Sequence, residues 1–276
     1  YPKCILVYPI IMKDELKGLL YFDNRIMYGA FTEAVLALLK PLSAQIAVSL
    51  ENANFYSAVE QFVPNQFLNL MHKRSILDVA SGDSVEMDIT IMFMDIRNFT
   101  STVENYQPFQ VYKLVNTLMG NMEPIIHKNN GFIDKYIGDA IMALFPLSPD
   151  DAFNASIAMH NAVRELNKNN TSELPSLRIG IGIHHGPAML GIVGQSSHLE
   201  GTVISSSVNT ASHIEDYTKT YKCSVLTTAD TITQLKNTNQ YKYRYVDNVH
   251  LKTSKKPVDL YQLINSEGKE LQEQLT

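Results

Sequence analysis

Two aspartates stand where they could meet at one edge of a sheet. Asp95 follows the apolar run of "ITIMFMDI", which is typical of a buried strand, and Asp139 belongs to the turn of a predicted hairpin in "NGFIDKYIGDAIMALFP". If these strands are neighbours, the two carboxylates repel each other unless a cation lies between them. Oxygen ligands without nearby Cys or His favour Mg²⁺ or Mn²⁺ over zinc. A pair of such ions could bridge a nucleotide's phosphates and activate a hydroxyl for in-line attack.

Each of these residues has a simpler explanation when it is taken alone. Aspartates are common in turns and caps, and Lys135, four residues before Asp139, reads as a solvated strand lysine. Only the pair of aspartates together with its flanking sequence favours a catalytic site.

Composition sets broad limits on function. The chain of 276 residues is 45% hydrophobic and 18% charged, as in an ordinary soluble globular protein. Its net charge is −5, and its basic residues are dispersed except at Lys252, Lys255 and Lys256, which argues against a nucleic-acid partner. Cys4 and Cys223 are far apart in apolar surroundings, so we expect buried free thiols in a reducing compartment.

The amino-terminal sequence gives expectations about context. The chain begins at Tyr1 inside an apolar run, without an initiator Met or a basic signal region, which predicts a piece of a longer protein. The most apolar window, 26–50, contains Glu33, Lys40 and Pro41, and therefore favours a pair of packed helices over a membrane span. We expect a cytoplasmic protein with no membrane span in this fragment.

The first sixty residues predict a hairpin and two helical segments. "CILVYPI" and "LKGLLYFDN" read as strands joined by a turn around Asp14 and Glu15, and a helix opens at Thr32 and breaks or kinks at Pro41. The chain from Pro41 to Phe62 is helical, with an apolar stripe that could pair with its copy in a dimer or pack on the preceding strands. The stripe comprises Leu42, Ile46, Leu50 and Ala53.

This region resembles the last third of a GAF domain. The likeness rests on "PI", "LKGLLYFDN" and "GAFTEAVLALLKPLSAQIAVSLENANFY" taken together. It implies a fragment of a sensor whose complete ligand pocket would need residues upstream of Tyr1.

The remainder alternates between strands and helices. Strands are predicted in "ITIMFMDI", in the hairpin around Asp139, in "LRIGIGIHHG", "AMLGIVG" and "CSVLTT", and in a closing hairpin "VHLKTSKKPVDLYQLI". Helices are predicted over 107–128, 152–168 and 206–217. This order is the split βαβ pattern of an α+β sandwich with helices on one face of the sheet.

Five motifs in order resemble the catalytic domain of class III nucleotidyl cyclases. They are "IMFMDIRNFT", "NGFIDKYIGDAIMALF", "LRIGIGIHHGPAMLGIVG", "GTVISSSVNTASHIE" and "VHLKTSKKPVDLYQL". The resemblance implies an α+β, ferredoxin-like cyclase sandwich preceded by a partial GAF fragment and a linker helix. We therefore expect a GAF fragment and the start of a signalling helix at 1–55, a linker at 56–85, a cyclase domain at 86–266 and a tail at 267–276.

The resemblance also implies a reaction and an assembly. Asp95, Asp139 and the Ile96 carbonyl would hold two Mg²⁺ or Mn²⁺ ions, and the 3′-hydroxyl of ATP would attack its own α-phosphate to give cyclic AMP and pyrophosphate. The site would lie between two cyclase units, with metals from one and base-reading residues from the other. One unit per chain then implies a homodimer through the cyclase domain and linker helix.

Four further positions correspond to nucleotide-binding residues of the family. Lys135 matches the purine-reading lysine, and Thr202 its partner; a lysine donor and a hydroxyl acceptor suit adenine, whereas guanylate cyclases carry an acidic residue and a cysteine at these places. Asn209 matches the asparagine that orients the ribose, and Lys252 matches a lysine on the terminal phosphates.

The chain departs from the family four residues after Asn209. The family's transition-state arginine is His213 here, and the usual glycine and acidic residue after "TVI" are Ser205 and Ser206. Losing such a charge could cost on the order of 10²-fold in rate. We expect an attenuated adenylate cyclase; the alternative is a unit inactive by itself, acting as a dimerising relay or as a heterodimer partner.

Two other enzyme classes fit less well. A diguanylate cyclase shares the metal-bearing hairpin, but its GG[DE]EF turn is replaced by "IGDA". A polymerase palm would need a positively charged track for nucleic acid.

Overall fold

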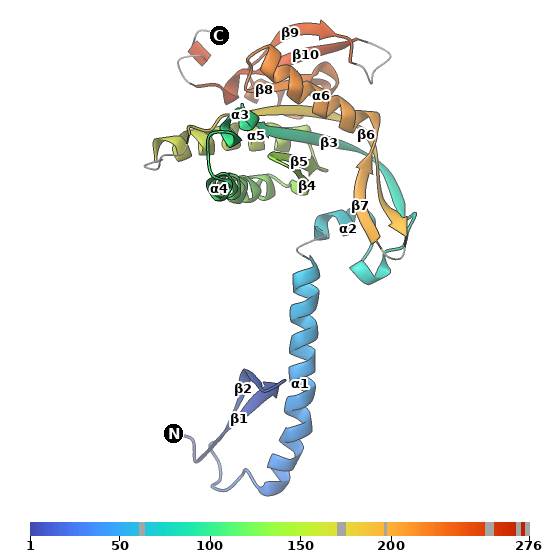
Figure 1. Cartoon of the computed structure of the whole chain (residues 1–276). Helices are drawn as coiled ribbons and strands as arrows, with labels where there is room; N and C mark the ends of the chain where they lie inside the picture. The colour runs from blue at the N-terminus through green and yellow to red at the C-terminus, as the bar shows by residue number, and fades with distance from the viewer. Residues whose placement is uncertain (61–63, 170–174, 196–197, 252–256, 269–271, 274–276) are drawn as a thin grey trace. The chain divides into compact units, whose positions relative to one another are not determined.

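The structure is a computed structural model that describes residues 1–60, 64–169, 175–195, 198–251, 257–268 and 272–273 (Figure 1). The chain divides into two compact units, Tyr1–Val63 and Pro64–Thr276. Each unit is described by itself.

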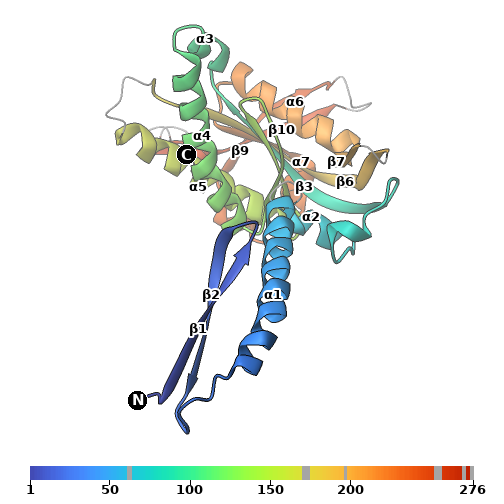
Figure 2. The same cartoon turned by 60° about the horizontal axis from the view of Figure 1, so that its bottom comes forward.

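The first unit is a hairpin with one long helix. Strands β1 (Cys4–Met12) and β2 (Glu15–Asn24) pair antiparallel, which confirms the predicted hairpin. Its turn residues Lys13 and Asp14 both have positive φ, 50° and 63°, as expected for a two-residue turn that follows the twist of the strands. Helix α1 (Glu33–Glu60) lies beside β1 (Figure 2).

Of the break or kink expected at Pro41, the break is wrong, and so is the expected pair of packed helices, because α1 is one continuous helix of 28 residues with Pro41 inside it. An interior proline costs a helix about 3 kcal/mol. The flanking segments are rich in Ala and Leu, which favour helix on both sides. The buried residues of α1 are Leu39, Ser43 and Ala47, whereas Leu42 and Leu50 of the predicted stripe are exposed.

By length and composition alone, part of α1 could cross a membrane. Among the described residues the segment Glu33–Val59 is long and apolar enough, with 17% of its most apolar window buried. Core helices of soluble proteins pass the same test, so this is weak evidence. The absence of a membrane span in this fragment stays a prediction.

The second unit is built on a mixed sheet. Its central strands are β3 (Ser84–Ile96), β5 (Ala140–Phe145) and β6 (Ile179–Gln195), and the strand order is β4-β5-β3-β6-β8-β10-β9. Strand β7 (His198–Ile204) pairs with the far part of β6. The other strands are β4 (Phe132–Ile137), β8 (Val225–Thr228), β9 (Tyr243–Val249) and β10 (Val258–Leu263). The β4–β5 and β9–β10 hairpins confirm the two predicted for this region.

The expected strands in "LRIGIGIHHG" and "AMLGIVG" are a single strand, β6, of 17 residues. Proline normally interrupts a central strand because it has no backbone N–H. Pro187 is tolerated because β8 pairs with β6 only as far as Ile183, and β7 pairs only from Met189 onward. At Pro187 the strand therefore has β3 as its single paired neighbour.

Helices cover both faces of the sheet, so the expectation of helices on one face holds only for α4 (Pro108–Lys128) and α5 (Pro149–Lys168). Met92 and Met94 of β3 point into the core shared with these helices. Ile91 and Phe93 point to the opposite face, where α6 (Ser206–Thr220) packs (Figure 1). The remaining helices are α2 (Asn65–Leu70), α3 (Phe99–Val103), α7 (Ala229–Thr233) and the 3₁₀ turns Ile76–Asp78, Thr238–Gln240 and Ile264–Ser266.

Parts of the predicted linker and tail belong to this packing. Phe67 of α2 is 2% exposed and lies in the same cluster as Ile91. Glu267, in the predicted tail, is buried and accepts hydrogen bonds from Ser224 and from Gln262.

Gly182 on β6 allows the backbone of α6 to approach the sheet closely. Along this strand Ile181 and Ile183 face α5, while Gly182 faces α6. A Cβ on Gly182 would lie 2.4 Å from the Glu215 amide nitrogen and 2.6 Å from the Ala211 carbonyl oxygen. The side chain is excluded by the backbone of α6, so the position of this helix depends on Gly182.

We predict that Gly182→Ala lowers the free energy of unfolding by about 3 kcal/mol, because the new methyl group must displace α6. Gly268→Ala is the control: no atom lies within 4 Å of its added Cβ, so it should change the stability by less than about 0.5 kcal/mol. Urea denaturation of both variants checks this, and equal stability of Gly182→Ala and wild type would contradict it.

Candidate active site

The two predicted metal-binding aspartates lie together. Strands β3 and β5 pair antiparallel with Met94 opposite Ile141, so the end of β3 reaches the two-residue turn that precedes Ala140. Gly138 opens this turn with a φ of 64°, which confirms the predicted turn chemistry. Burial and the neighbouring Asp95 carboxyl group, which also shares a hydrogen bond, raise the pKa of Asp139 to about 6.

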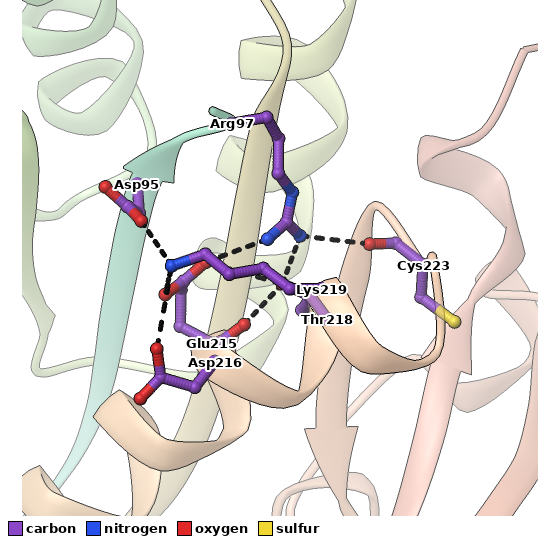
Figure 3. A network of polar contacts seen from close by, with 7 residues as sticks. All are labelled: Asp95, Arg97, Glu215, Asp216, Thr218, Lys219 and Cys223. Carbon is purple, nitrogen blue, oxygen red and sulfur yellow. Dashed lines mark hydrogen bonds and ion pairs between the residues drawn. The ribbon is translucent and has the colours of Figure 1, made fainter. Parts of the chain in front are cut away.

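Asp95 is held by a lysine of α6 (Figure 3). The Lys219 Nζ donates to Asp95 Oδ2 over 2.6 Å, and it lies 3.5 Å from Glu215 Oε2 and 3.6 Å from Asp216 Oδ1. The Lys219 side chain is 45% exposed and that of Asp95 is 19% exposed. A single ammonium group therefore joins the end of β3 to the carboxyl-terminal half of α6.

Arg97 continues this network into the protein interior. Its Nη1 lies 3.3 Å from Glu215 Oε1, and its Nη2 donates to Thr218 Oγ1 and to the Cys223 carbonyl oxygen (Figure 3). Burial raises the pKa of Glu215 to about 7, although the nearby Lys219 and Arg97 oppose the shift. A cavity of about 650 Å³ lies beside this network, with Arg97 and Lys219 in its lining.

Sequence reasoning missed Arg97, Glu215 and Lys219. The i, i+4 spacing of Glu215 and Lys219 places them on one face of a helix that was predicted only as far as residue 217. The contact of Lys219 with Asp95 depends on the packing of α6 against β6, which the spacing alone does not reveal.

The carboxylate pair suits a hard divalent cation. Its donors are oxygen atoms only, and burial beside a second carboxylate penalises the doubly ionised state unless a cation is present. No group of three His, Cys, Asp or Glu side chains within the described residues could hold a metal ion. Any ion here must take its other ligands from the backbone, water or a substrate.

The structure also brings together the two predicted base-reading residues. Lys135 of β4 and Thr202 of β7 are 3.3 Å apart between Nζ and Oγ1. Lys135 Nζ also donates to Glu200 Oε1 over 3.0 Å, a neighbour that the sequence did not predict. Both acceptors lie on β7, so this strand fixes the direction of the Lys135 side chain.

Asn209 and His213 lie one turn apart on α6, with Asn209 exposed and His213 half-buried. Neither forms a hydrogen bond or ion pair with Asp95 or Asp139 in the described part of this chain. Ser205 is the N-cap of the helix and accepts a hydrogen bond from the Val208 amide at 3.0 Å. Lys252 lies outside the described residues.

The two cysteines are free. Cys223 is buried, as expected, and burial raises the pKa of its thiol to about 11; the expectation of burial is wrong for Cys4, which is half-buried.

Asp134, beside Lys135, is a buried carboxyl group whose ionisation lowers the stability of the fold. Its Oδ2 has no hydrogen-bond partner within the described residues and lies 3.6 Å from Lys135 Nζ. Burial raises its pKa from 3.8 to about 6. The pKa of Asp134 is higher in the folded than in the unfolded state, so folding favours the protonated carboxyl group. The contribution of this protonation to stability is complete below about pH 4 and is lost as pH rises through about 6.

We therefore predict that Asp134→Asn is more stable than wild type by about 1–2 kcal/mol at pH 8, and that the difference shrinks toward pH 5. Urea denaturation at the two pH values measures it. A variant less stable than wild type at pH 8 would mean that the ionised carboxylate is favourably paired with Lys135.

Comparisons with known proteins agree with this geometry. Residues 84–265 match the family described as adenylate and guanylate cyclase catalytic domain. The chain is 34% identical over 230 residues to an adenylate cyclase of Anabaena cylindrica, covering 80% of this chain and 46% of the relative. It is 36% identical over 216 residues to a terminal-differentiation specific adenylate cyclase of Dictyostelium discoideum, covering 76% of this chain and 10% of the relative.

A solved structure shows the same fold. The adenylyl cyclase CyaB from P. aeruginosa matches with a TM-score of 0.58 and 26% identity, over 65% of this chain and 95% of that one. The chain spans less than half the length of the two curated relatives that it matches. With the family match over residues 84–265, these likenesses show that the chain belongs to the adenylate and guanylate cyclase catalytic domain family.

Proposed function

We propose that this chain is an adenylate cyclase that converts ATP to cyclic AMP and pyrophosphate in a homodimer. The observation that carries the proposal is the carboxylate pair where the end of β3 meets the β4–β5 turn, on a fold that separately joins Lys135 to Thr202. The two curated relatives described above are both named adenylate cyclase, which supports ATP as substrate.

Asp95, Asp139 and the Ile96 carbonyl are the residues that would hold two Mg²⁺ or Mn²⁺ ions. When bound there, such ions would neutralise the triphosphate and lower the pKa of the attacking 3′-hydroxyl. The raised pKa of Asp139 supports this assignment, because the pair stores electrostatic repulsion that a divalent cation relieves.

Lys135 and Thr202 would recognise the base. The Lys135 ammonium donates a hydrogen bond to adenine N1, and the Thr202 hydroxyl accepts one from the adenine amino group; guanine presents a protonated N1 and a carbonyl oxygen instead. The hydrogen bond to Glu200 holds the ammonium group beside the Thr202 hydroxyl. Positioning of this donor before substrate arrives reduces the cost of ordering it on binding.

The residues of α6 would contact the sugar and the phosphates. Asn209 orients the ribose, and His213 stands where the family has an arginine that stabilises charge on the α-phosphate. Histidine is shorter and lacks the planar fork of five donors, so the rate should be reduced by on the order of 10²-fold. Lys252 is proposed to contact the terminal phosphates.

A second chain would complete each site. Asn209 and His213 form no polar contact with the carboxylate pair of their own chain, which supports a site shared between protomers. An open groove of about 760 Å³ runs along α4 and the β4–β5 turn, lined by apolar side chains such as Tyr112 and Met119. We assign this groove to the homodimer interface because it adjoins Gly138, next to Asp139.

The first unit would regulate the enzyme. We propose that it is the end of a GAF sensor, that α1 transmits its state to the dimer, and that the protein is cytoplasmic. Misplacement of catalytic groups by about 1 Å can cost roughly 10²-fold, so a small rotation between protomers would suffice.

The second candidate function is a dimerising relay or heterodimer partner without activity of its own. His213 favours it, since a partner chain could supply the missing arginine. The serine at 205 does not favour it, because Ser205 caps α6 and so preserves the start of the helix.

We predict that the purified chain with Mn²⁺ forms cyclic AMP from ATP, that Asp139→Ala abolishes turnover, and that His213→Arg raises kcat by about tenfold or more. Cyclic-nucleotide production measured for all three proteins checks this. Turnover only after arginine is introduced would establish the relay instead.

We also predict that Lys135→Glu combined with Thr202→Cys shifts the preference from ATP toward GTP, because a carboxylate accepts the hydrogen bond that guanine N1 donates. The ratio of kcat/KM for the two nucleotides measures the shift. An unchanged ratio in an active variant would exclude these two residues from base recognition.

A further inference from the structure

Lys219 forms an ion pair with Asp95, a carboxylate that a metal ion would need as a ligand. Its Nζ contacts Asp95 Oδ2 at 2.6 Å and is held in place by Glu215 and Asp216, at 3.5 Å and 3.6 Å (Figure 3). Both supporting carboxylates are on α6 itself, one turn before the lysine. The side chain that reaches across to β3 is thus anchored by its own helix.

A divalent cation and an ammonium group cannot share this position without repulsion. Two unit charges 4 Å apart interact by about 4 kcal/mol at the effective dielectric of a protein surface, and one partner here would carry two charges. Exposed ion pairs are weak, however, and the Lys219 side chain is 45% exposed. The contact can therefore be broken, but breaking it reduces the affinity of the site for metal.

Lys219 has other ion-pair partners when its contact with Asp95 is broken. Glu215 and Asp216 remain within reach of its flexible stem, and Glu215 is also paired with Arg97. Lys219 can keep an ion pair with a carboxylate of α6 while Asp95 binds a metal cation instead. The exchange needs no change in the backbone of β3.

We propose that Lys219 is a positioning residue that competes with the divalent cation for Asp95 and so keeps the carboxylate pair poor in metal until a nucleotide brings additional ligands. This inference rests on the proposed metal site of Asp95 and Asp139. A purely structural lysine would only stabilise the fold through its ion pair with Asp95. A competing lysine also weakens metal binding, so removal of its charge strengthens metal binding although an ion pair is lost.

The competition also links two functional parts of one chain. Helix α6 carries Asn209 and His213 in its first half and Lys219 near its end. If a cation displaced Lys219 from Asp95, this helix would lose its polar contact with Asp95 and would stay joined to the end of β3 through Arg97. Metal binding at one site of the dimer then affects the helix that serves the other site.

The test is Mn²⁺ binding without nucleotide, measured from the electron paramagnetic resonance signal of free Mn²⁺. Lys219→Met should bind Mn²⁺ about tenfold more tightly than wild type, and Lys219→Arg, which keeps the charge, should bind like wild type. Mn²⁺ should also raise the melting temperature of Lys219→Met more than that of wild type.

The matched control is Lys222→Gln. This lysine follows α6, is exposed and lines the same cavity as Lys219. Its replacement therefore removes the same charge from the region and leaves the ion pair between Lys219 and Asp95 intact. It should change the affinity by less than about twofold.

Two results would overturn the inference. If Lys219→Met binds Mn²⁺ no more tightly than wild type, or if Lys222→Gln gains as much, Lys219 does not compete at Asp95. If neither wild type nor Lys219→Met binds Mn²⁺ and Asp139→Ala changes nothing, the metal site itself is absent, and the proposed function fails with it.

Discussion

The repulsion between Asp95 and Asp139 is the constraint on which the rest of the site depends. The antiparallel register of β3 and β5 places both carboxylates at the same end of these two strands, and burial prevents water from separating their charges fully. The ammonium group of Lys219, which comes from helix α6, offsets this repulsion by pairing with Asp95. A protein that needed only stability could replace the pair with neutral residues. Retaining two carboxylates and a removable counter-ion is what a site for exchangeable cations requires.

Strand β6 makes this arrangement possible because its two faces carry different side chains. Isoleucines fill the core beneath α5, and Gly182 on the other face lets the backbone of α6 come within contact distance of the strand. That approach brings Glu215 and Lys219 to the end of β3, and it leaves Asn209 and His213 at the other end of the helix. In the proposed function, one helix would therefore affect metal binding through Lys219 in its last turn and would contact the nucleotide through Asn209 and His213.

Much of the fold could be predicted from the sequence, because hairpins and amphipathic helices leave local signals. The turn at Gly138 and Asp139, helix α4 and the β9–β10 hairpin are such cases. The helix break expected at Pro41 and the two separate strands expected on either side of Pro187 were wrong, since strong helix formers and tertiary pairing override a local breaker. Within the site, the motifs indicated Asp95, Asp139, Lys135 and Thr202. Lys219 and Glu200 could not be predicted, because their roles depend on contacts 124 and 65 residues apart in the chain.

The central claim is that metal-binding and nucleotide-binding residues act from opposite protomers, and mixing two disabled chains tests it most directly. Asp139→Ala and Asn209→Ala should each have little activity alone. After the two are mixed and allowed to exchange subunits, cyclic AMP formation should return to about a quarter of the wild-type rate, because half of the dimers then hold one intact site. A mixture that stays inactive while wild type turns over ATP, with heterodimers present, would contradict the account.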